Sequence, residues 1–376
     1  MKKYLIIAIF ALILMCGCSK EKVSDSIDKD VTSLKKFKNA TYNADTDYQS
    51  FLSEYSDVVL VDNGYYASYD GFLYYIDKAA INKTFVCSNP NCMHNNVDCD
   101  AYLGDASSLQ YYNGNLYYVV YEGNKAVVCS RTLDSSVISE ICSIDSTDVI
   151  PLISVHRGYA FYALFDGNDS CSLFRVKLES KAVPEKIYTC RGFDSQIYKI
   201  NGYGDGVLFV NSIALDEEYN SFNFRILYYD IDENAVKSVA EDAGGSYAVS
   251  DDRVYYWKKD AVYCYTPDKN ETTAFYKTDE PVFVSFDGEN FYFDNKYGIN
   301  IGYTDSKKHT VYVVNREGVL LDAIKLSDTI CCYGDKDYLF QTTSNGYMLL
   351  DKKQIRTGDF KWINMPLSVK IEEQND

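Results

Sequence analysis

The chain has 376 residues, with 36 Tyr and 19 Phe against only 6 Pro and 2 Trp. Aromatic side chains suit pleated strands, so this composition favours an all-β fold with a large core. The net charge of −17 argues against nucleic-acid binding and against adhesion to anionic lipid, because both need clusters of Lys and Arg.

Residues 1–17 have the pattern of a lipoprotein signal peptide. A basic start is followed by an uninterrupted apolar run over residues 5–15, which is too short to span a bilayer. The run ends in Met15-Cys16-Gly17-Cys18, which resembles the lipobox of bacterial lipoproteins, although Met15 and Cys16 stand where Leu and a small residue are usual. The resemblance implies that Cys18 carries the lipid and holds the chain at the extracellular face of the cell membrane. The alternative is an ordinary cleaved signal peptide.

Residues 18–56 are polar and mixed in charge, with little periodicity. We interpret this segment as a tether, with a short helix near residues 48–55. Strand-like patterning then continues over residues 57–369, and residues 370–376 form a polar tail. The sequence therefore predicts one folded domain behind a tether.

One short phrase recurs seven times in this domain: an acidic or Gly-containing turn followed by paired aromatic or aliphatic residues. The phrases begin at Asp70, Asn113, Arg157, Asp205, Asp251, Asp287 and Asp335. Successive phrases lie 36 to 48 positions apart. Self-similarity at this period, with only strand-like content, indicates a radial array of β-sheets.

The second repeat shows the expected strands most clearly, at residues 108–112, 116–121, 126–131 and 137–142. Asn113-Gly114 between the first two is a strong hairpin signal, because both residues tolerate positive φ. Four antiparallel strands in each of seven repeats predict a β-propeller, with six or eight blades as alternatives.

Two arrangements are open for the closure of the ring. Residues Val58–Val61 precede the strand before the first phrase, and they are one candidate for the outer strand of the last blade. Residues Phe360–Ile363 are the other candidate. The sequence does not separate the two.

This organisation resembles the TolB-like β-propeller lipoproteins of unknown function that are found in Firmicutes. The resemblance covers most of the chain, but it is carried by a degenerate repeat, so it implies a fold and little chemistry. Only one Gly-Gly pair occurs, at Gly244-Gly245, whereas kelch repeats need one in each blade.

The densest group of metal-ligating side chains comes at the end of the first repeat. Cys87, Cys92, His94 and Cys99 have the spacing C-x4-C-x-H-x4-C in a loop rich in Asn. Three thiols and an imidazole suit a structural zinc ion, and four protein donors leave no open position for catalysis. The alternative is a disulfide, Cys92–Cys99 or Cys87–Cys99, since exported proteins mature in oxidising surroundings. Similar Cys-Pro-Cys-His-Cys segments in the propeller lipoproteins named above imply a purposeful cluster without identifying what it binds.

Two further cysteine pairs are placed for disulfides across hairpins. In an antiparallel hairpin, opposite residues have position numbers with a constant sum, which sets Cys129 against Cys142 and Cys171 against Cys190. Directly opposite positions approach closely enough for a disulfide. The alternative is that these thiols are small buried hydrophobic groups.

Motifs of common hydrolases and phosphate-binding enzymes are absent from the sequence, including G-x-S-x-G, H-E-x-x-H and the P-loop. We therefore expect a monomeric, non-enzymatic binding or scaffold module whose ligand is a protein, peptide or glycan. The alternative is a cell-envelope carbohydrate hydrolase or lyase with carboxylates in the central channel. Two converging carboxylates about 5–9.5 Å apart would indicate that alternative.

Overall fold

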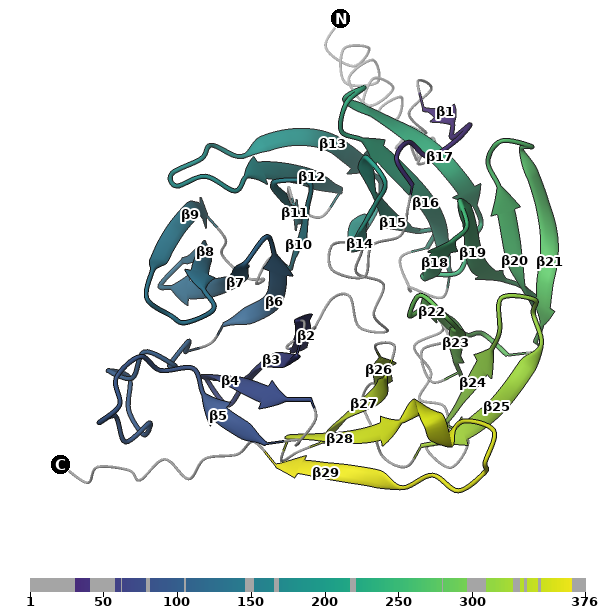
Figure 1. Cartoon of the computed structure of the whole chain (residues 1–376). Coiled ribbons are helices and arrows are strands. Elements are labelled where there is room, and N and C mark those ends of the chain that lie inside the picture. The colour runs from purple at the N-terminus through teal and green to yellow at the C-terminus, as the bar shows by residue number, and fades with distance from the viewer. Residues whose placement is uncertain are drawn as a thin grey trace, which may run out of the picture. The chain divides into compact units, whose positions relative to one another are not determined.

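A computed structural model describes residues 31–40, 58–61, 63–78, 82–104, 106–145, 152–165, 169–216, 221–278, 280–295, 309–326, 332–334, 337–343 and 346–366. These residues form seven blades of four antiparallel strands each, arranged as a ring, and a fifth strand joins one of the blades. The fold is a seven-bladed β-propeller (Figure 1). The predicted fold class and blade number are therefore confirmed. Cys18, the signal peptide and the helix expected near residues 48–55 lie outside the described residues.

Each blade is built from consecutive strands, from the innermost outward. Blade 1 contains β2 (Val58–Val61), β3 (Gly64–Tyr69), β4 (Phe72–Asp77) and β5 (Lys83–Phe85). Blade 2 contains β6 (Ser107–Tyr112), β7 (Asn115–Glu122), β8 (Lys125–Thr132) and β9 (Ile138–Asp145). Blade 3 contains β10 (Ile153–His156), β11 (Tyr159–Phe165), β12 (Ser170–Lys177) and β13 (Glu185–Arg191). Blade 4 contains β14 (Gln196–Tyr203), β15 (Gly206–Ala214), β16 (Phe222–Asp230) and β17 (Ala235–Glu241).

Blade 5 contains β18 (Tyr247–Ser250), β19 (Arg253–Lys258), β20 (Ala261–Thr266) and β21 (Glu271–Lys277). Blade 6 contains β22 (Phe283–Phe286), β23 (Phe291–Asp294), β24 (Thr310–Val314) and β25 (Leu320–Lys325). Blade 7 contains β26 (Cys332–Gly334), β27 (Tyr338–Thr343), β28 (Gly346–Asp351) and β29 (Trp362–Pro366). A 3₁₀ helix, η3 (Lys352–Gln354), follows β28. Among the residues listed above as described, no helix is long and apolar enough to cross a membrane.

The ring closes without a strand shared between its ends. Val58–Val61 is β2, the innermost strand of blade 1, so its assignment to the last blade is wrong. The outer strand of blade 7 is β29, which overlaps the other candidate segment. The physical reason is an unrecognised hairpin, because Val61 pairs with Gly64 and the Asn63-Gly64-Tyr65-Tyr66 sequence provides the first turn of blade 1. The phrase at Asp70 lies one hairpin later, between β3 and β4.

Tyrosine side chains fill the interfaces between blades. The largest fully buried side chains in the described chain include Tyr65, Tyr74, Tyr162, Tyr203, Tyr228, Tyr229, Tyr247, Tyr292 and Tyr347. The clusters that contain them draw on neighbouring blades. The repeated aromatic pairs are therefore mainly core residues, and their burial supplies much of the apolar area removed from water on folding.

Blades 1 and 7 meet through side chains. The Tyr65 and Phe340 rings lie edge to face with centroids 4.8 Å apart, and Tyr69 contacts Tyr347 in the same way at 6.1 Å. Lys78 of blade 1 forms an ion pair with Asp337 of blade 7. Aromatic packing and one ion pair therefore connect the two ends of the ring.

A segment before the propeller packs on blade 4. β1 (Thr32–Ser33) pairs in parallel with β17 and makes blade 4 a five-stranded sheet. Leu34 and Phe37 are buried there, and the Phe37 ring packs on Tyr203 and Tyr228. Residues 31–40 belong to the segment expected to be a tether, and this contact was not predicted because the few apolar side chains that make it, Val31, Leu34, Phe37 and Ala40, follow no strand or helix period.

Candidate functional site

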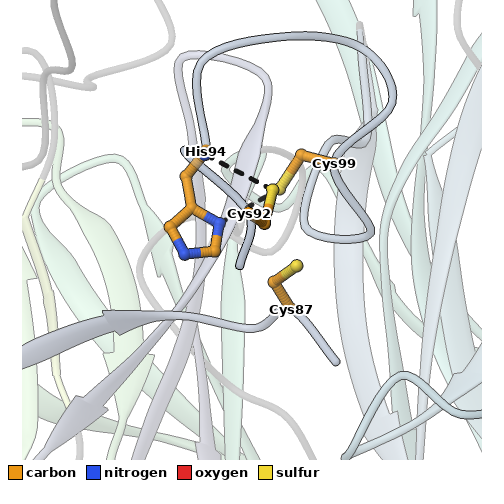
Figure 2. Close-up of side chains that lie close together, drawn as sticks. All are labelled: Cys87, Cys92, His94 and Cys99. Carbon is orange, nitrogen blue, oxygen red and sulfur yellow. Dashed lines mark hydrogen bonds between the residues drawn. The ribbon is translucent and has the colours of Figure 1, made fainter. Parts of the chain in front are cut away.

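The loop between β5 and β6, residues 86–104, is here called the cysteine loop. It brings the four predicted donors together, as Figure 2 shows. The ligand atoms of Cys87, Cys92, His94 and Cys99 all lie within 4.8 Å of one another. His94 Nδ1 is 3.3 Å from Cys99 Sγ. Cys99 is buried, and the other three side chains are half-buried. The arrangement is one that could hold a metal ion such as zinc.

Short polar residues give the loop its turns. The side-chain oxygen of Asn89 accepts a hydrogen bond from the Asn91 N–H at 3.0 Å, and that of Asn96 accepts one from the Asp98 N–H at 3.2 Å. These Asx turns reverse the chain without a regular element. His94 has a φ of 53°, in the left-handed region. The loop therefore folds back twice, and its donors face a common point.

Two sulfur atoms also accept backbone hydrogen bonds. The His94 N–H donates to Cys92 Sγ, and the Ala101 N–H donates to Cys99 Sγ, each at 3.4 Å. A tetrahedral zinc site with Zn–S bonds of about 2.3 Å and Zn–N bonds of about 2.0 Å sets its donors about 3.5–3.8 Å apart. The observed donor set needs only small side-chain movements to reach that geometry, so the residues fit zinc.

The thiols of the cluster differ in how readily they ionise. Burial raises the pKa of Cys99 to about 12, and the neighbouring thiols act in the same direction. At Cys87 burial opposes ionisation, but hydrogen bonds to Asn89 and Asp100 and to the other thiols outweigh it, and the pKa is lowered. A bound cation favours the thiolate at every ligand.

A buried cation on blade 2 supports the cysteine loop. Arg131 on β8 is buried, and its Nη2 donates to the Asp100 carbonyl at 2.5 Å. Its Nε and Nη1 are buried with no hydrogen-bond partner in the described part of the chain. Zinc bound by three thiolates and a neutral imidazole carries a single net negative charge, which would offset this guanidinium. The unpartnered donors therefore agree with a charged centre on the loop.

The loop is fixed to blade 1 at both ends of the cluster. The Phe85 and His94 rings stack, with centroids 4.5 Å apart and planes 18° apart. The Leu73 N–H donates to the Ala101 carbonyl at 2.8 Å, and the Leu103 N–H donates to the Gly71 carbonyl at 2.7 Å. The cluster is thus continuous with the sheet of blade 1. Cys87, Cys92 and Cys99 are unbridged in the structure.

The two hairpin cysteine pairs behave differently. Cys171 lies directly opposite Cys190 in the β12–β13 pairing, as the constant-sum argument predicts. In blade 2, Cys142 lies opposite Val128 and Cys129 opposite Glu140, so the predicted alignment is wrong there. The reason is a register shift between Val128 and Cys129, a β-bulge that moves one strand by a residue.

The remaining described histidines serve the architecture. His156 is fully buried, with Nε2 2.8 Å from the Gly204 carbonyl oxygen. His309 is buried with Nε2 2.8 Å from Asp294 Oδ1. Neither lines the cavity described next.

A cavity of about 1050 Å³ lies where blade 7 meets blades 1 and 6, and it is here called the seam cavity. Its walls come from the turns and strand ends of those three blades: Asn63, Tyr75, Asp77–Lys78, Glu289–Asn290, Leu321, Asp337–Tyr338, Asp351–Lys353 and Ile355–Arg356. Sequence reasoning missed this site, because its walls are up to some 290 positions apart and no local motif joins them.

The fold and the cysteine loop define the chain as a seven-bladed β-propeller with a Cys3His cluster on its first blade. No protein-family model and no curated protein matches it. Prolyl oligopeptidase B from Galerina marginata is similar over 84% of this chain and 52% of its own length, at 12% identity and a TM-score of 0.54.

Two further solved structures show the same range of similarity. TolB from Acinetobacter baumannii matches 73% of this chain and 61% of its own length, at 11% identity and a TM-score of 0.40. Acylaminoacyl peptidase from Pyrococcus horikoshii matches 88% and 54%, at 9% identity and a TM-score of 0.49. The chain therefore spans between about half and three fifths of the length of these proteins, and the similarity extends to the fold alone.

Proposed function

We propose that the protein is a lipid-anchored propeller on the extracellular face of the cell membrane that binds a protein, peptide or glycan without changing it chemically. The seam cavity is the observation that carries the proposal. It has the volume of a ligand site, and it lies at a junction between blades. Among the described residues that line it, there is no serine, threonine, cysteine or histidine.

In this proposal the cysteine loop is a structural metal centre. Cys87, Cys92, His94 and Cys99 would hold zinc, which would supply four bonds that hold the turns of the loop together. Four protein donors fill a tetrahedral site, so the ion is held for stability rather than for chemistry. The half-buried position of three of the ligands is compatible with loading after folding.

The second candidate is a carbohydrate hydrolase or lyase. The specific observation in its favour is that Asp77, Glu289, Asp337 and Asp351 all line the seam cavity. Two of these carboxylates already have structural tasks: Asp337 pairs with Lys78, and Asp351 accepts a hydrogen bond from the Lys353 N–H at 2.9 Å. This engagement favours binding over acid–base catalysis.

The test uses the full chain, purified in detergent and applied to an array of envelope glycans and peptides. Bound material is eluted and its mass is measured. Retention of a ligand of unchanged mass is the expected result. Cleavage products would establish the hydrolase or lyase instead, and a chain that retains nothing would overturn the binding function.

The membrane location has a separate test. Replacing Cys18→Ala should move the chain from the membrane fraction to the medium or leave it unprocessed, whereas Cys16→Ala should stay with the membrane. Equal distribution of both variants and the parent chain would contradict lipidation at Cys18.

A further inference from the structure

Most of the residues that line the seam cavity have polar side chains. Ten of its fourteen lining residues are charged or carry an amide. Sites for apolar small molecules are mainly hydrophobic, with only a few placed polar groups. A cavity lined by this many polar side chains suits a ligand that itself carries many hydroxyl or charged groups, as a saccharide does.

Part of this charge is already neutralised within the protein. Lys78 pairs with Asp337. Lys352 pairs with Asp287, which also accepts a hydrogen bond from the Tyr292 hydroxyl at 2.6 Å. Lys352 and Asp287 are both buried, and the Lys352 Nζ lies 4.7 Å from the centre of the Tyr292 ring. These pairs form the frame of the cavity, so they do not determine which charge it attracts.

The two cationic side chains that lie outside this frame stand close together in the sequence. Arg356 and Lys353 stand in the segment between β28 and β29, and both are exposed. Within the described residues, neither side chain has a hydrogen bond or ion pair, and each contributes only its backbone N–H. Glu289, which lines the cavity from blade 6, also bonds only through its backbone N–H in the described part of the chain, and this N–H donates to Asp287. The cavity thus offers two cations, Lys353 and Arg356, alongside the carboxylates of Asp77, Glu289 and Asp351 and the amide of Asn290.

Arg356 is held in an unfavourable backbone conformation. Its φ of 76° is the largest positive value of any described residue other than glycine. The Arg356 N–H donates to Asp322 Oδ2 of blade 6 at 2.7 Å, and this bond fixes the turn. Glycine fills such positions without strain, so the Arg356 side chain can be removed there without a cost to the backbone.

We infer that the seam cavity binds an acidic saccharide, with Arg356 and Lys353 receiving the carboxylate of a uronic acid unit. The planar guanidinium matches a carboxylate with two parallel hydrogen bonds, which a single ammonium cannot provide. The hydroxyl groups of the sugar then face Glu289, Asn290 and Asn63, which accept and donate hydrogen bonds. The inference rests on the proposed binding function and names the ligand class of that site.

The experiment measures binding of the full chain to a glucuronate-containing oligosaccharide by calorimetry. A matched neutral glucose oligosaccharide and glucose 6-phosphate are the comparison probes, because a phosphate could use the same cations. We expect the uronate to bind at least about tenfold more tightly than the neutral sugar, the effect of a charge-assisted contact, and more tightly than the phosphate. Equal affinity for the uronate and the neutral sugar would overturn the inference.

Arg356→Gly separates binding from folding, because glycine removes the cation and also relieves the backbone. Its melting temperature should be unchanged or higher, while uronate affinity falls at least about tenfold. Lys181→Gly is the matched control, since Lys181 is also exposed with a positive φ of 59° but lies in the β12–β13 hairpin. Lys353→Gln should weaken binding as well.

The outcomes distinguish this inference from the function on which it rests. If Arg356→Gly leaves uronate binding unchanged, or if glycan-array ligands are neutral, the acidic-saccharide assignment fails while the binding function stands. If the array retains no ligand of any class, both fail. Tighter binding of glucose 6-phosphate than of the uronate would overturn the carboxylate assignment alone.

Discussion

His94 makes two contacts at once in the cysteine loop. Its ring stacks on Phe85 at the end of β5, and its Nδ1 lies 3.3 Å from Cys99 Sγ. The stack orients the imidazole before any ion is bound, which lowers the cost of ordering the ligand. The spacing of the four donors was visible in the sequence, but this orientation was not, because Phe85 belongs to the strand and not to the motif.

The first prediction concerns the content of the cluster. The native chain should contain about one zinc ion, and Cys99→Ser should contain almost none and melt at a lower temperature, since binding free energy is part of folding free energy. The measurement is elemental analysis with thermal unfolding. Cys264→Ser, a buried thiol on β20, is the control that should keep the metal. The disulfide alternative would be established by a native chain that contains no zinc and in which the peptide covering residues 87–99 gains, on reduction, the mass expected for opening one disulfide.

The residues of the seam cavity could not be predicted from the sequence. Asn63, Glu289 and Arg356 are brought together by the closure of the ring, and each is an ordinary turn residue in its own repeat. A clustered motif such as C-x4-C-x-H-x4-C can be recognised locally, whereas a site assembled from three blades needs the fold first.

At the level of strands, the repeated phrase predicted hairpins better than it predicted their order. Strands β6 to β9 fall within a few residues of the expected ranges. Blade 1 was displaced by one hairpin, because Asn63-Gly64-Tyr65-Tyr66 and Asp70-Gly71-Phe72-Leu73 both satisfy the pattern. A β-bulge is equally hard to foresee, since one extra residue changes the partner of every later position.

The second prediction concerns the hairpin cysteines and follows from the strand register of the β12–β13 and β8–β9 pairings. Under mild oxidation, Cys171 should form a disulfide with Cys190, its direct partner, and Cys129 should form none with Cys142. Peptide mapping under non-reducing conditions measures both in one sample. A Cys129–Cys142 peptide, or quantitative alkylation of Cys171 without reductant, would contradict the argument.

The third prediction concerns the ionic contact between the docked segment and blade 4. Burial opposes ionisation of Asp230, but the Glu233 N–H, Lys237 and Lys38 outweigh it, and the pKa of Asp230 lies below its usual 3.8. Because the pKa is lower in the folded state, the charged carboxylate stabilises the fold at pH values above 3.8. This stabilisation is lost as the pH falls from 3.8 through the lower folded-state pKa. Asp230→Asn should therefore be less stable than the parent at pH 7, with a difference that shrinks towards pH 3.

Urea unfolding at several pH values measures this difference. Asp268→Asn is the control, because Asp268 is exposed and should change stability little at any pH. A gap between parent and Asp230→Asn that stays constant from pH 7 to pH 3 would contradict the assignment of this contact to the charged carboxylate.

On the scale of the whole molecule, the interface that closes the ring differs from the other interfaces between blades. Six interfaces between blades are crossed by the covalent chain, and the interface between blades 7 and 1 is not. Packing of Tyr65, Phe340 and their neighbours and the Lys78–Asp337 ion pair hold that seam. Sequence periodicity predicted the number of blades, but it could not predict closure, because both ends of the chain carry strand-forming residues.

The fourth prediction tests the seam. Phe340→Ala should reduce the free energy of unfolding by about 3–5 kcal/mol, the usual cost of truncating a buried Phe. Hydrogen exchange should then quicken in blades 1 and 7 together. Phe161→Ala, which empties the interface between blades 3 and 4, should cost a similar free energy and leave exchange at the seam unchanged. Identical exchange patterns in the two variants would show that the seam is no weaker than other interfaces.

The docking of residues 31–40 on blade 4 sets how far the propeller can travel. Gly204 permits this docking, since a Cβ there would lie 2.3 Å from the Lys38 carbonyl oxygen. With the lipid proposed at Cys18, the leash ends at Val31 and reaches at most about 45 Å, whereas a leash to residue 57 would reach about 135 Å. The volume that the propeller explores shrinks by roughly the cube of that ratio, so its effective concentration near the anchor rises in proportion. With the proposed anchor in place, the pairing of β1 with blade 4 would therefore confine the propeller to a thinner layer above the bilayer.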